Sequence, residues 1–430
     1  MLDLKENFNS KKILIYGYGI SGKACFHYLK KKNKVFIYDD NKKNIPSVTK
    51  KKITKEKILK SKFDVIIISP GIDKKKCGLS KFIKKNDRKT VTELDIFYLN
   101  NLKNKKITIT GTNGKSTTAK LIYEIIKKNN KDVRLGGNIG KPLLFEKNIK
   151  KNTLFVIEAS SYQIEYSKYF RSDIAAILNI SPDHLERHQT FSKYINAKLK
   201  LIKNQNKNGL TFINKSNLKF LSNKKINSKI IKVKKFPQET NKIKNQYFKN
   251  LNNLNNLSFA ISISKKLGLN KKKTEIAINS FKGLPYRQQI IYKRRNLQII
   301  NDSKSTSFSS TNQLLKSYKN IFWILGGLPK KGDHFTLEKK YFKNIKAYIY
   351  GKNKNFFQRK LINKIPFKNF KDIPHALFGV LKDLKKEKDK NLNVVFSPCS
   401  ASFDQFENFE KRGEFFNKML KKTNFIKKAV

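Results

Sequence analysis

The sequence predicts an α/β protein of three domains, and three observations support this prediction. The chain has 430 residues, which is enough for two or three domains of roughly 100 to 200 residues each. Short apolar runs alternate with helix-length stretches along most of the chain, which is typical of parallel sheets covered by helices. Glycine-containing turns and polar residues directly follow several of the expected strands, at the edge where such sheets bind their ligands.

The first α/β unit lies at the N-terminus. We expect strands at residues 11–16, 35–38 and 63–69 and a helix at residues 21–29. The turn GYGISG between the first strand and the helix matches the glycine fingerprint of dinucleotide-binding turns, and Asp39 lies near the position of the acid that meets a ribose hydroxyl. A helix N-terminus would hold a sugar nucleotide as well as NAD, and a purely structural tight turn also stays open.

The second unit contains the most specific local motif, GTNGKST. We expect strands at residues 106–110, 154–158 and 174–179 and a helix at residues 118–128. Backbone N–H groups and the ammonium of Lys115 can together hold a triphosphate here, with Ser116 or Thr117 on magnesium. Gly111 and Gly114 stand closer together than in the general phosphate-loop pattern. We therefore predict a variant phosphate loop, and the alternative is a glycine turn that only caps the helix.

Candidate metal ligands follow the other two strands of this unit. Glu158 ends one strand in VIEASSYQ, and His184 lies just after the other in NISPDHLERH, so both are expected at the edge that carries the phosphate loop. Magnesium prefers oxygen ligands, so His184 could equally be a capped loop residue. We expect His188 to face solvent, and local sequence alone makes Lys198 one more exposed lysine. Residues 203–250 predict only short strands or loops.

The third unit begins near Tyr286. We expect strands at residues 298–301, 321–325, 347–350 and 393–397. The segments NDSKSTS, LGGLPKKGDHF and SPCSASFDQFENFEKRG each follow one of these strands. Together they offer an acid, cations and hydroxyls to an anionic substrate, although each segment is also compatible with loop capping alone.

Composition narrows the class of protein. The net charge of +64 would by itself suggest a polyanion partner. Lysine is spread through the whole chain and greatly outnumbers arginine, however, which indicates a composition bias and not a nucleic-acid surface. No apolar run approaches the roughly 18 residues of a membrane span, and the three cysteines fit a reducing compartment. We expect a cytoplasmic protein without a nucleic-acid partner and without membrane insertion.

Taken in order, these motifs resemble those of the Mur ligase family, with matches from residue 11 to about residue 413. The matching segments are GYGISG, SPGI, TELDIF, GTNGKST, GGNIG, IEASSYQIE, LNISPDHLERH, AKLKL, GLPYR, NDSKSTS, LGG followed by lysines, and SPCSASFDQFENFEKRG. The motif order and the last segment resemble the family members that add D-glutamate more than their siblings.

The resemblance implies a domain layout and a reaction. It implies a Rossmann-like domain at residues 1–92 for the uridine diphosphate, a central phosphate-loop ATPase-like parallel sheet at residues 93–285, and a C-terminal Rossmann-like domain at residues 286–430 for the amino acid. The implied enzyme is an ATP-dependent ligase of peptidoglycan precursor synthesis. It would join D-glutamate to UDP-N-acetylmuramoyl-L-alanine through an acyl phosphate, with a pair of Mg²⁺ ions, as a monomer.

The resemblance also implies a role for each matched residue. ATP would be bound by Gly111, Thr112, Asn113, Gly114, Lys115, Ser116, Thr117, Asn256, Arg287 and Asp302. The UDP-substrate would be bound by Gly19, Ile20, Ser21, Asp39, Asp40, Gly71 and Asn138. The metals would be served by Ser116, Glu158, His184 and a carbamylated Lys198. D-Glutamate would be bound by Thr306, Lys330 or Lys331, Ser402 and Phe409. The catalytic set would be Lys115, His184, Lys198 and Lys304, of which Lys304 favours the acyl phosphate.

Two departures from the family pattern leave alternatives open. Tyr286 stands in GLPYR where the family usually has His, and in the Asn-rich stretch NNLNNLSFA either Asn253 or Asn256 would meet ATP. The nearest alternatives are a sibling ligase and a folate polyglutamate ligase, although GYGISG argues against the folate enzyme. An NAD-dependent oxidoreductase would explain GYGISG and Asp39, and a nucleic-acid-binding protein would explain the charge. Neither class accounts for GTNGKST.

Overall fold

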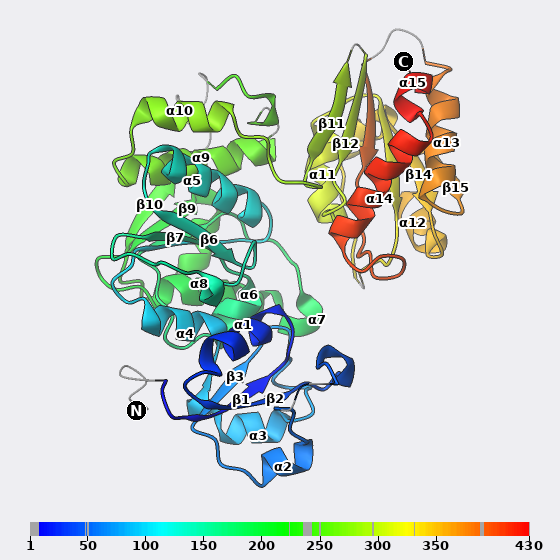
Figure 1. Ribbon diagram of the computed structural model, residues 1–430. Helices are drawn as coiled ribbons and strands as arrows, with labels where there is room; N and C mark the ends of the chain where they lie inside the picture. The colour runs from blue at the N-terminus through cyan, green and yellow to red at the C-terminus, as the bar shows by residue number, and fades with distance from the viewer. Residues whose placement is uncertain are drawn as a thin grey trace. The chain divides into compact units, whose positions relative to one another are not determined.

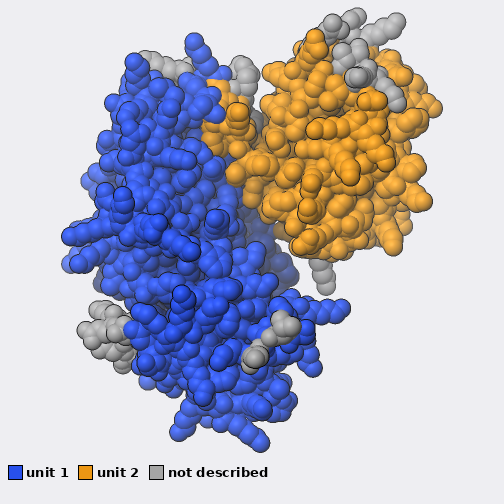
Figure 2. Space-filling view, in the orientation of Figure 1, with its two compact units in different colours: residues 1–244, 255–280 blue, residues 245–254, 281–430 orange. Residues whose placement is uncertain are grey.

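The computed structural model describes residues 8–47, 49, 51–222, 224–234, 243–248, 251–294, 296–330, 332–387 and 391–429. The chain forms two compact units, residues 1–244 with 255–280 and residues 245–254 with 281–430 (Figure 2). The first unit holds two parallel sheets and the second holds one mixed sheet (Figure 1). The predicted α/β class with three sheets is confirmed, and the boundaries at 1–92, 93–285 and 286–430 stay predictions.

The first sheet has four parallel strands in the order β2-β1-β3-β4. Its strands are β1 (Lys12–Tyr16), β2 (Lys34–Tyr38), β3 (Val65–Ile68) and β4 (Thr90–Val91). Its helices are α1 (Ile20–Leu29), α2 (Lys55–Leu59), α3 (Ser80–Lys85) and α4 (Glu93–Asn100). Every residue of β3 is buried, as in strands that helices cover on both faces. The predicted strands and helix of this unit are confirmed with small shifts at their ends.

The second sheet has six parallel strands in the order β10-β9-β8-β5-β7-β6. Its strands are β5 (Lys106–Thr110), β6 (Val133–Gly137), β7 (Leu154–Glu158), β8 (Ile174–Ile177), β9 (Leu210–Asn214) and β10 (Lys229–Val233). Its helices are α5 (Lys115–Lys128), α6 (Ser161–Tyr166), α7 (Leu185–His188), α8 (Phe191–Lys203), α9 (Leu251–Lys266) and α10 (Lys271–Asn279). Strand β5 pairs with β7 on one side and β8 on the other. The loop after β5 therefore lies between the carboxyl ends of the strands that lead to Glu158 and His184.

The third sheet has the strand order β11-β12-β16-β13-β14-β15, in which only β11 is antiparallel to its neighbour. Its strands are β11 (Gln289–Arg294), β12 (Leu297–Asn301), β13 (Ile321–Gly326), β14 (Ile345–Tyr350), β15 (Phe367–Phe370) and β16 (Leu392–Phe396). Its helices are α11 (Phe308–Lys316), α12 (Lys354–Leu361), α13 (Ile373–Leu384), α14 (Phe409–Lys422) and α15 (Phe425–Ala429). All four strands predicted for this unit are present.

Short 3₁₀ helices connect several of these elements. They are η1 (Lys42–Asn44), η2 (Asp87–Lys89), η3 (Leu143–Phe145), η4 (Lys215–Leu221), η6 (Gln246–Phe248) and η7 (Lys339–Asn344). Residues 203–250, for which the sequence predicted only short strands or loops, contain β9 and β10 in their described part. Among the described residues, no helix is both long and apolar enough to cross a membrane.

One apolar core joins the first two sheets. It contains Ile13 and Ile15 of β1 together with Phe155 and Ile157 of β7. Helix α4 adds Phe97, whose ring lies edge-on to Phe155 with the ring centroids 4.8 Å apart. Burial of this shared apolar surface stabilises the two sheets as one body, so the glycine turn after β1 and the phosphate loop after β5 have a defined spatial relation.

Candidate active site

The segment Gly111–Thr117 adopts the conformation that a phosphate loop requires. Gly111 and Gly114 have φ angles of +152° and +82°, and only glycine adopts such angles without steric cost. Gly114 directly precedes α5, so the first N–H groups of that helix open onto the loop. Asn179, beyond the end of β8, ties the loop down: its backbone oxygen accepts from Thr112 N at 2.8 Å and its Oδ1 accepts from Asn113 N at 2.8 Å.

Sequence reasoning missed this role of Asn179. The only available signal was its position just after a buried strand, which it shares with many loop residues. Its amide also donates to the carbonyl oxygen of Asn113 at 3.0 Å. The side chain of Asn179 therefore both accepts from and donates to the backbone of Asn113. These two hydrogen bonds restrict the backbone of the loop before any ligand binds.

Two lysines lie against the same carbonyl of the loop. Lys115 Nζ donates to the oxygens of Gly111 at 3.0 Å and Thr112 at 2.8 Å. Lys198 Nζ, from α8, donates to the Gly111 oxygen at 2.8 Å and lies 4.6 Å from the centroid of the Tyr194 ring. Burial, together with the charge of Lys115, holds the pKa of Lys198 well below its usual range. The two amines thus lie together where a phosphate would sit, and burial disfavours the charged form of Lys198.

The expectation that Lys198 is an exposed lysine is wrong, because its exposed fraction is 1%. Helix α8 is amphipathic, and Lys198 lies one turn from Tyr194 and one turn from Leu201 on the helix face that packs on the sheet. Both neighbours are buried. A lysine at a core position of an amphipathic helix was a readable signal, and the local reading overlooked it.

Glu158 and Asn138 form a hydrogen-bonded pair at the end of β7. Glu158 is 1% exposed, and its Oε1 accepts from Asn138 Nδ2 at 2.9 Å. Among the described residues, its buried Oε2 has no hydrogen-bond partner, which is costly for a carboxylate oxygen. Oxygen atoms of this kind are the ligands that Mg²⁺ prefers. The donor set at this edge therefore fits a hard divalent cation.

His184 precedes α7 in a left-handed conformation with a φ of 54°. Its Nε2 lies 3.3 Å from Asp183 Oδ2, and its Nδ1 lies 3.5 Å from Glu186 Oε1. The negative charge of Asp183 also acts on buried Lys198, whose pKa it raises against the effect of burial. Asp183 is thus a second carboxylate of this region that sequence reasoning missed, although it stands beside His184 in the same motif.

The expectation that His188 faces solvent is also wrong. Its side chain has an exposed fraction of 0%, its Nε2 lies 2.9 Å from Ser161 Oγ, and its ring stacks on Tyr162 with centroids 5.3 Å apart. Burial lowers the pKa of His188 to about 4, so the ring is neutral near pH 7. It fastens the short helix α7 to α6, a tertiary contact that the local sequence does not reveal.

The sequence left open whether Asn253 or Asn256 would meet ATP, and the two side chains have different surroundings in the structure. A Cβ added at Gly114 would collide with the side chain of Asn256, so Asn256 lies against the phosphate loop. The amide of Asn253 instead donates to the backbone oxygen of Tyr247 at 3.0 Å. The position of Asn256 therefore favours this residue for a contact with a bound nucleotide.

Within the described residues, no three His, Cys, Asp or Glu side chains converge as a metal site.

The glycine turn after β1 is tightly built. Gly22 lies against the carbonyl of Gly17, because a Cβ at Gly22 would collide with that oxygen. Asp39 is 6% exposed, and its carboxylate accepts from Tyr18 N at 2.7 Å and Asn41 N at 2.9 Å. Asp39, the acid that was predicted to bind a ribose, therefore stabilises the backbone of this turn.

The other residues predicted for the UDP-substrate line the same region. Asp40 Oδ2 accepts from the Tyr16 hydroxyl at 2.6 Å. Ser21 lies near the buried carboxyl of Glu93, whose pKa burial raises. Ile20 is 76% exposed, and a Cβ at Gly19 or Gly71 would meet no atom within 4 Å. Open space therefore lies beside both glycines, where a ligand backbone could approach closely.

In the second unit, two predicted cations lie over the ring of Phe409, which is itself a predicted site residue. Lys304 Nζ lies 4.3 Å and Arg287 Cζ lies 5.6 Å from the centroid of Phe409. Asp302 is 5% exposed and accepts from Ser397 Oγ at 2.9 Å and from Gln288 N at 3.0 Å. Burial raises the pKa of Asp302 to about 7.

The remaining predicted amino-acid ligands are spread over neighbouring loops. Ser402 is buried, whereas Thr306 and Lys330 are half-buried. Lys331, the alternative to Lys330, lies outside the described residues. Asp333 Oδ2 accepts from Phe308 N at 2.8 Å, which brings the turn after Lys330 to the start of α11, close to Thr306.

Sequence reasoning missed Arg412, which organises these loops. Its exposed fraction is 1%, and its Nη2 donates to the backbone oxygens of Ser303 at 2.7 Å and Ser400 at 2.9 Å. The guanidinium thus joins the loop after β12 to the loop after β16. The sequence signal was weak, because the chain has many cations in its C-terminal helices.

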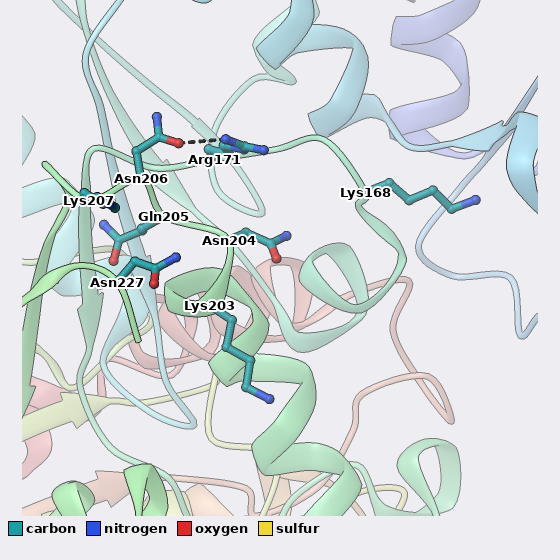
Figure 3. Close-up of a pocket in the computed structure, with 8 residues that line it drawn as sticks. All are labelled: Lys168, Arg171, Lys203, Asn204, Gln205, Asn206, Lys207 and Asn227. Carbon is teal, nitrogen blue, oxygen red and sulfur yellow. Dashed lines mark hydrogen bonds between the residues drawn. The ribbon is translucent and has the colours of Figure 1, made fainter. Parts of the chain in front are cut away.

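A pocket of about 490 Å³ lies in the first unit (Figure 3). Its lining residues are Lys168, Arg171, Lys203, Asn204, Gln205, Asn206, Lys207 and Asn227. They precede β8, β9 and β10, whereas the phosphate loop follows β5, so this pocket lies at the opposite edge of the parallel sheet. Arg171 Nη1 already donates to Asn206 Oδ1 at 2.7 Å, and we assign no substrate to it.

The sequence of this chain is similar to those of known proteins. Residues 109–280 match the Mur ligase middle domain. The chain is 32% identical over 447 residues to the protein of Rickettsia felis named UDP-N-acetylmuramoylalanine--D-glutamate ligase, with 97% of this chain and 98% of that protein covered. It is 34% identical over 453 residues to the protein of the same name from Buchnera aphidicola, with 98% and 100% covered.

Solved structures share the fold at low sequence identity. MurF from Acinetobacter baumannii has a TM-score of 0.60 at 15% identity, covering 76% of this chain and 79% of that chain. The MurF ligase from Thermotoga maritima in complex with ADP has a TM-score of 0.59 at 14% identity, covering 98% of each chain. Because the two sequence relatives match over nearly their whole length, and the middle-domain match spans the phosphate loop, the chain belongs to the Mur ligase family.

Proposed function

We propose that the chain is an ATP-dependent ligase that joins D-glutamate to UDP-N-acetylmuramoyl-L-alanine in the cytoplasmic synthesis of peptidoglycan precursors. The observation that carries this proposal is the convergence of Lys115 and Lys198 on the Gly111 carbonyl, at the same sheet edge as buried Glu158, in a member of the Mur ligase family. Lys115 would supply positive charge and Glu158 a cation ligand, and both are what the transfer of a phosphoryl group between two anions requires.

ATP would be held by residues 111–117 and Asn256. The N–H groups at the start of α5 point toward the loop, and Lys115 can turn from its two carbonyl partners toward the β- and γ-phosphates. Ser116 and Thr117 are buried at the first turn of this helix, which suits a hydroxyl that meets a phosphate-bound cation. Asn256 packs against Gly114, within reach of the same nucleotide.

Ser116, Glu158 and His184 would hold a pair of Mg²⁺ ions. Such ions neutralise phosphate charge and align the reacting oxygens. The support is the partnerless buried oxygen of Glu158 together with Asp183 beside His184. Lys198 would join them as a carbamate: burial favours its uncharged amine, which is the form that adds CO₂, and the product carries oxygen ligands in place of a cation.

The sugar nucleotide would lie on the turn after β1, in a domain of residues 1–92. Its phosphates would meet the start of α1 at Gly19, Ile20 and Ser21. Asp39 and Asp40 would shape the nucleoside side of the site, and Gly71 would let the substrate approach the backbone. Asn138, bound to Glu158, would meet the carboxylate end of the same substrate.

The second unit would supply the amino-acid site. The two domains concerned would be a central domain of residues 93–285 and a C-terminal domain of residues 286–430. Arg287 and Asp302 would contact ATP, and Lys304 would favour the acyl phosphate. D-Glutamate would be bound by Thr306, Lys330, Ser402 and Phe409. The packing of two cations on Phe409 supports an anionic ligand there.

The reaction would proceed in two steps. A carboxylate oxygen of the muramoyl-L-alanine attacks the γ-phosphorus of ATP, the bond to the β-phosphate oxygen breaks, and ADP leaves. The amine of D-glutamate then attacks the acyl carbon, an amide bond forms, phosphate leaves and the amine loses a proton. Lys115 stabilises charge on the transferred group in the first step, and Lys304 stabilises the acyl phosphate before the second. We propose that the enzyme works as a monomer.

A substrate panel tests this proposal. Purified full-length chain is supplied with Mg²⁺ and ATP, and phosphate release is measured with each substrate alone and with both. We expect release only when UDP-N-acetylmuramoyl-L-alanine and D-glutamate are both present. Equal turnover with L-lysine or L-alanine would reject the amino-acid assignment and indicate a sibling ligase, and turnover with a folate in place of the sugar nucleotide would indicate the folate enzyme.

A further inference from the structure

Arg187 connects the loop after β3 to helix α7, and the proposed reaction requires these two parts of the first unit to keep a fixed distance from each other. It lies on α7, one helical turn after His184, and its side chain is only 12% exposed. Its guanidinium donates to three successive backbone oxygens in the loop after β3: Nη2 to Pro70 at 3.2 Å, Nη1 to Gly71 at 3.2 Å and Nη2 to Ile72 at 2.6 Å.

The surroundings of Arg187 fix the plane of the guanidinium. Nη2 also donates to the hydroxyl of Tyr166 at 2.7 Å, and Cζ lies 4.8 Å from the centroid of the Tyr162 ring. Asp73 Oδ2 lies 3.8 Å from Nε. A guanidinium offers five N–H donors in one plane and can stack flat on a ring, whereas an ammonium group has three donors and no plane to stack. The contact set is therefore specific for arginine.

These bonds orient the backbone of the loop after β3. A peptide N–H points away from the carbonyl of its own peptide group. With the Pro70 oxygen held on Arg187, the N–H of Gly71 is directed to the opposite side. Gly71 also has open space where a Cβ would stand. Arg187 thus fixes the orientation of the peptide groups in a loop that also has open space beside Gly71.

The same bonds also hold α7. A helix of four residues has too few internal hydrogen bonds to be stable alone, so its position depends on its side chains. His188 anchors it to α6 through Ser161, and Arg187 anchors it to the loop after β3. The position of His184 at the start of α7 follows from these two anchors.

We propose that Arg187 is a positioning residue for the ligase reaction. It fastens the loop of residues 70–72, which holds the UDP-substrate, to the short helix that carries His184, and so sets the span between the bound sugar nucleotide and the phosphate loop. This inference rests on the proposed function, because it concerns the same two sites.

Kinetics of two variants of the full-length chain test the role of Arg187. Arg187→Lys keeps the charge but loses the fork, and Arg187→Gln loses both. We expect the KM for UDP-N-acetylmuramoyl-L-alanine to rise and kcat to fall, each by about tenfold for Arg187→Gln and less for Arg187→Lys, because a displacement of about 1 Å can cost up to a hundredfold in rate. The KM for ATP should rise less than the KM for the sugar nucleotide, since Arg187 acts on the nucleotide site only through His184 and donates to no atom of residues 111–117 in the described structure.

Two further variants separate positioning from general stability. Arg171→Gln removes an exposed guanidinium that donates to Asn206 in the same unit, and it should leave all three constants unchanged. Tyr166→Phe removes one acceptor of Arg187 and should shift the same constants as Arg187→Lys in the same direction, by less. Circular dichroism melting of each variant measures the folded fraction, so Tyr166→Phe keeps the test valid if Arg187→Gln fails to fold.

The outcomes are distinct. If the Arg187 variants keep both constants within twofold, or lose kcat only in proportion to the folded fraction with the KM for the sugar nucleotide unchanged, the positioning role is overturned. If the unaltered chain shows no turnover with D-glutamate, the proposed function fails instead. Calorimetric binding of UDP-N-acetylmuramoyl-L-alanine to the unaltered chain and to Arg187→Gln then still decides whether Arg187 orders the loop of residues 70–72.

Discussion

Lys115 and Lys198 share one acceptor: the carbonyl oxygen of Gly111 lies 3.0 Å from Nζ of Lys115 and 2.8 Å from Nζ of Lys198. Burial disfavours the charged form of Lys198, and the charge of Lys115 adds to that effect. The positive charge of Lys115 therefore favours the neutral amine of Lys198, because two cations this close would repel each other. Lys115 is therefore the cation of this pair that would meet a bound polyphosphate.

Replacing Lys115 by Ala should lower turnover by about a hundredfold or more, because a charge that clamps the transferred phosphate is lost. Steady-state phosphate release with both substrates measures the effect. Lys120→Ala is the matched control, since Lys120 lies on the same helix and pairs with Glu124 at 2.6 Å. Its turnover should stay within about twofold. Equal losses in both variants would show that the loss at Lys115 is not specific.

Removing dissolved CO₂ should lower turnover reversibly, because the proposed carbamate on Lys198 would dissociate. Burial favours the uncharged amine of Lys198, which is the form that reacts with CO₂. Added bicarbonate should restore turnover, and ¹³C-bicarbonate should give a carbamate signal by NMR. Lys198→Arg should be inactive and insensitive to bicarbonate. Full activity in CO₂-free buffer would argue against the carbamate while leaving the phosphate loop in place.

Gly114→Ala should weaken ATP binding by at least about tenfold, since it distorts a loop whose N–H groups face the phosphates. Gly114 has a φ of +82°, and the added Cβ would collide with Asn256. Gly268→Ala is the control, because Gly268 has a φ of +63° with no atom near its Cβ position. Both variants should lose about 1 to 2 kcal/mol of stability from the left-handed backbone. Calorimetric ATP titration should separate them, and similar affinities would count against the loop geometry.

Asp302 should make the stability of the second unit depend on pH. Burial raises the pKa of Asp302 from 3.8 to about 7, so between these values the folded chain keeps a proton that the unfolded chain has released. The free energy of unfolding should therefore fall as pH rises from about 4 to about 7, by about 1.4 kcal/mol for each unit between the two pKa values.

Asp302→Asn removes this titration. Urea unfolding of the unaltered chain and of the variant, without nucleotide, at several pH values over this range measures the difference between them. The difference in unfolding free energy should change steadily with pH and level off above about pH 7. A difference that is constant with pH would mean that Asp302 titrates alike in the folded and unfolded chain.

The strands were largely readable from the sequence. The run LFVIE became β7 with the predicted ends, and the run FDVIIIS became β3, because buried parallel strands need continuous apolar residues. The phosphate loop was readable for a different reason. Its glycines and the lysine that follows them are close in the sequence, so their geometry depends on few long-range contacts.

The environments of single side chains were less readable. Both His188 and Lys198 were expected at the surface, and both are buried. His188 is buried because α7 packs on α6, and Lys198 is buried because α8 turns its apolar face to the sheet. The asparagine that lies beside Gly114 could likewise be chosen only when α9 was placed against the loop.

The sequence by itself determined the α/β class, the strand positions, the phosphate loop and the resemblance to one ligase family, since these depend on local pattern and motif order. Only the tertiary structure decided that β5 lies between β7 and β8, that two lysines meet at one carbonyl, and that Arg187 holds the loop of residues 70–72. The physical reason is that charge repulsion, desolvation and multiple hydrogen bonds depend on distances between residues that are far apart in the chain, and these distances are fixed by packing.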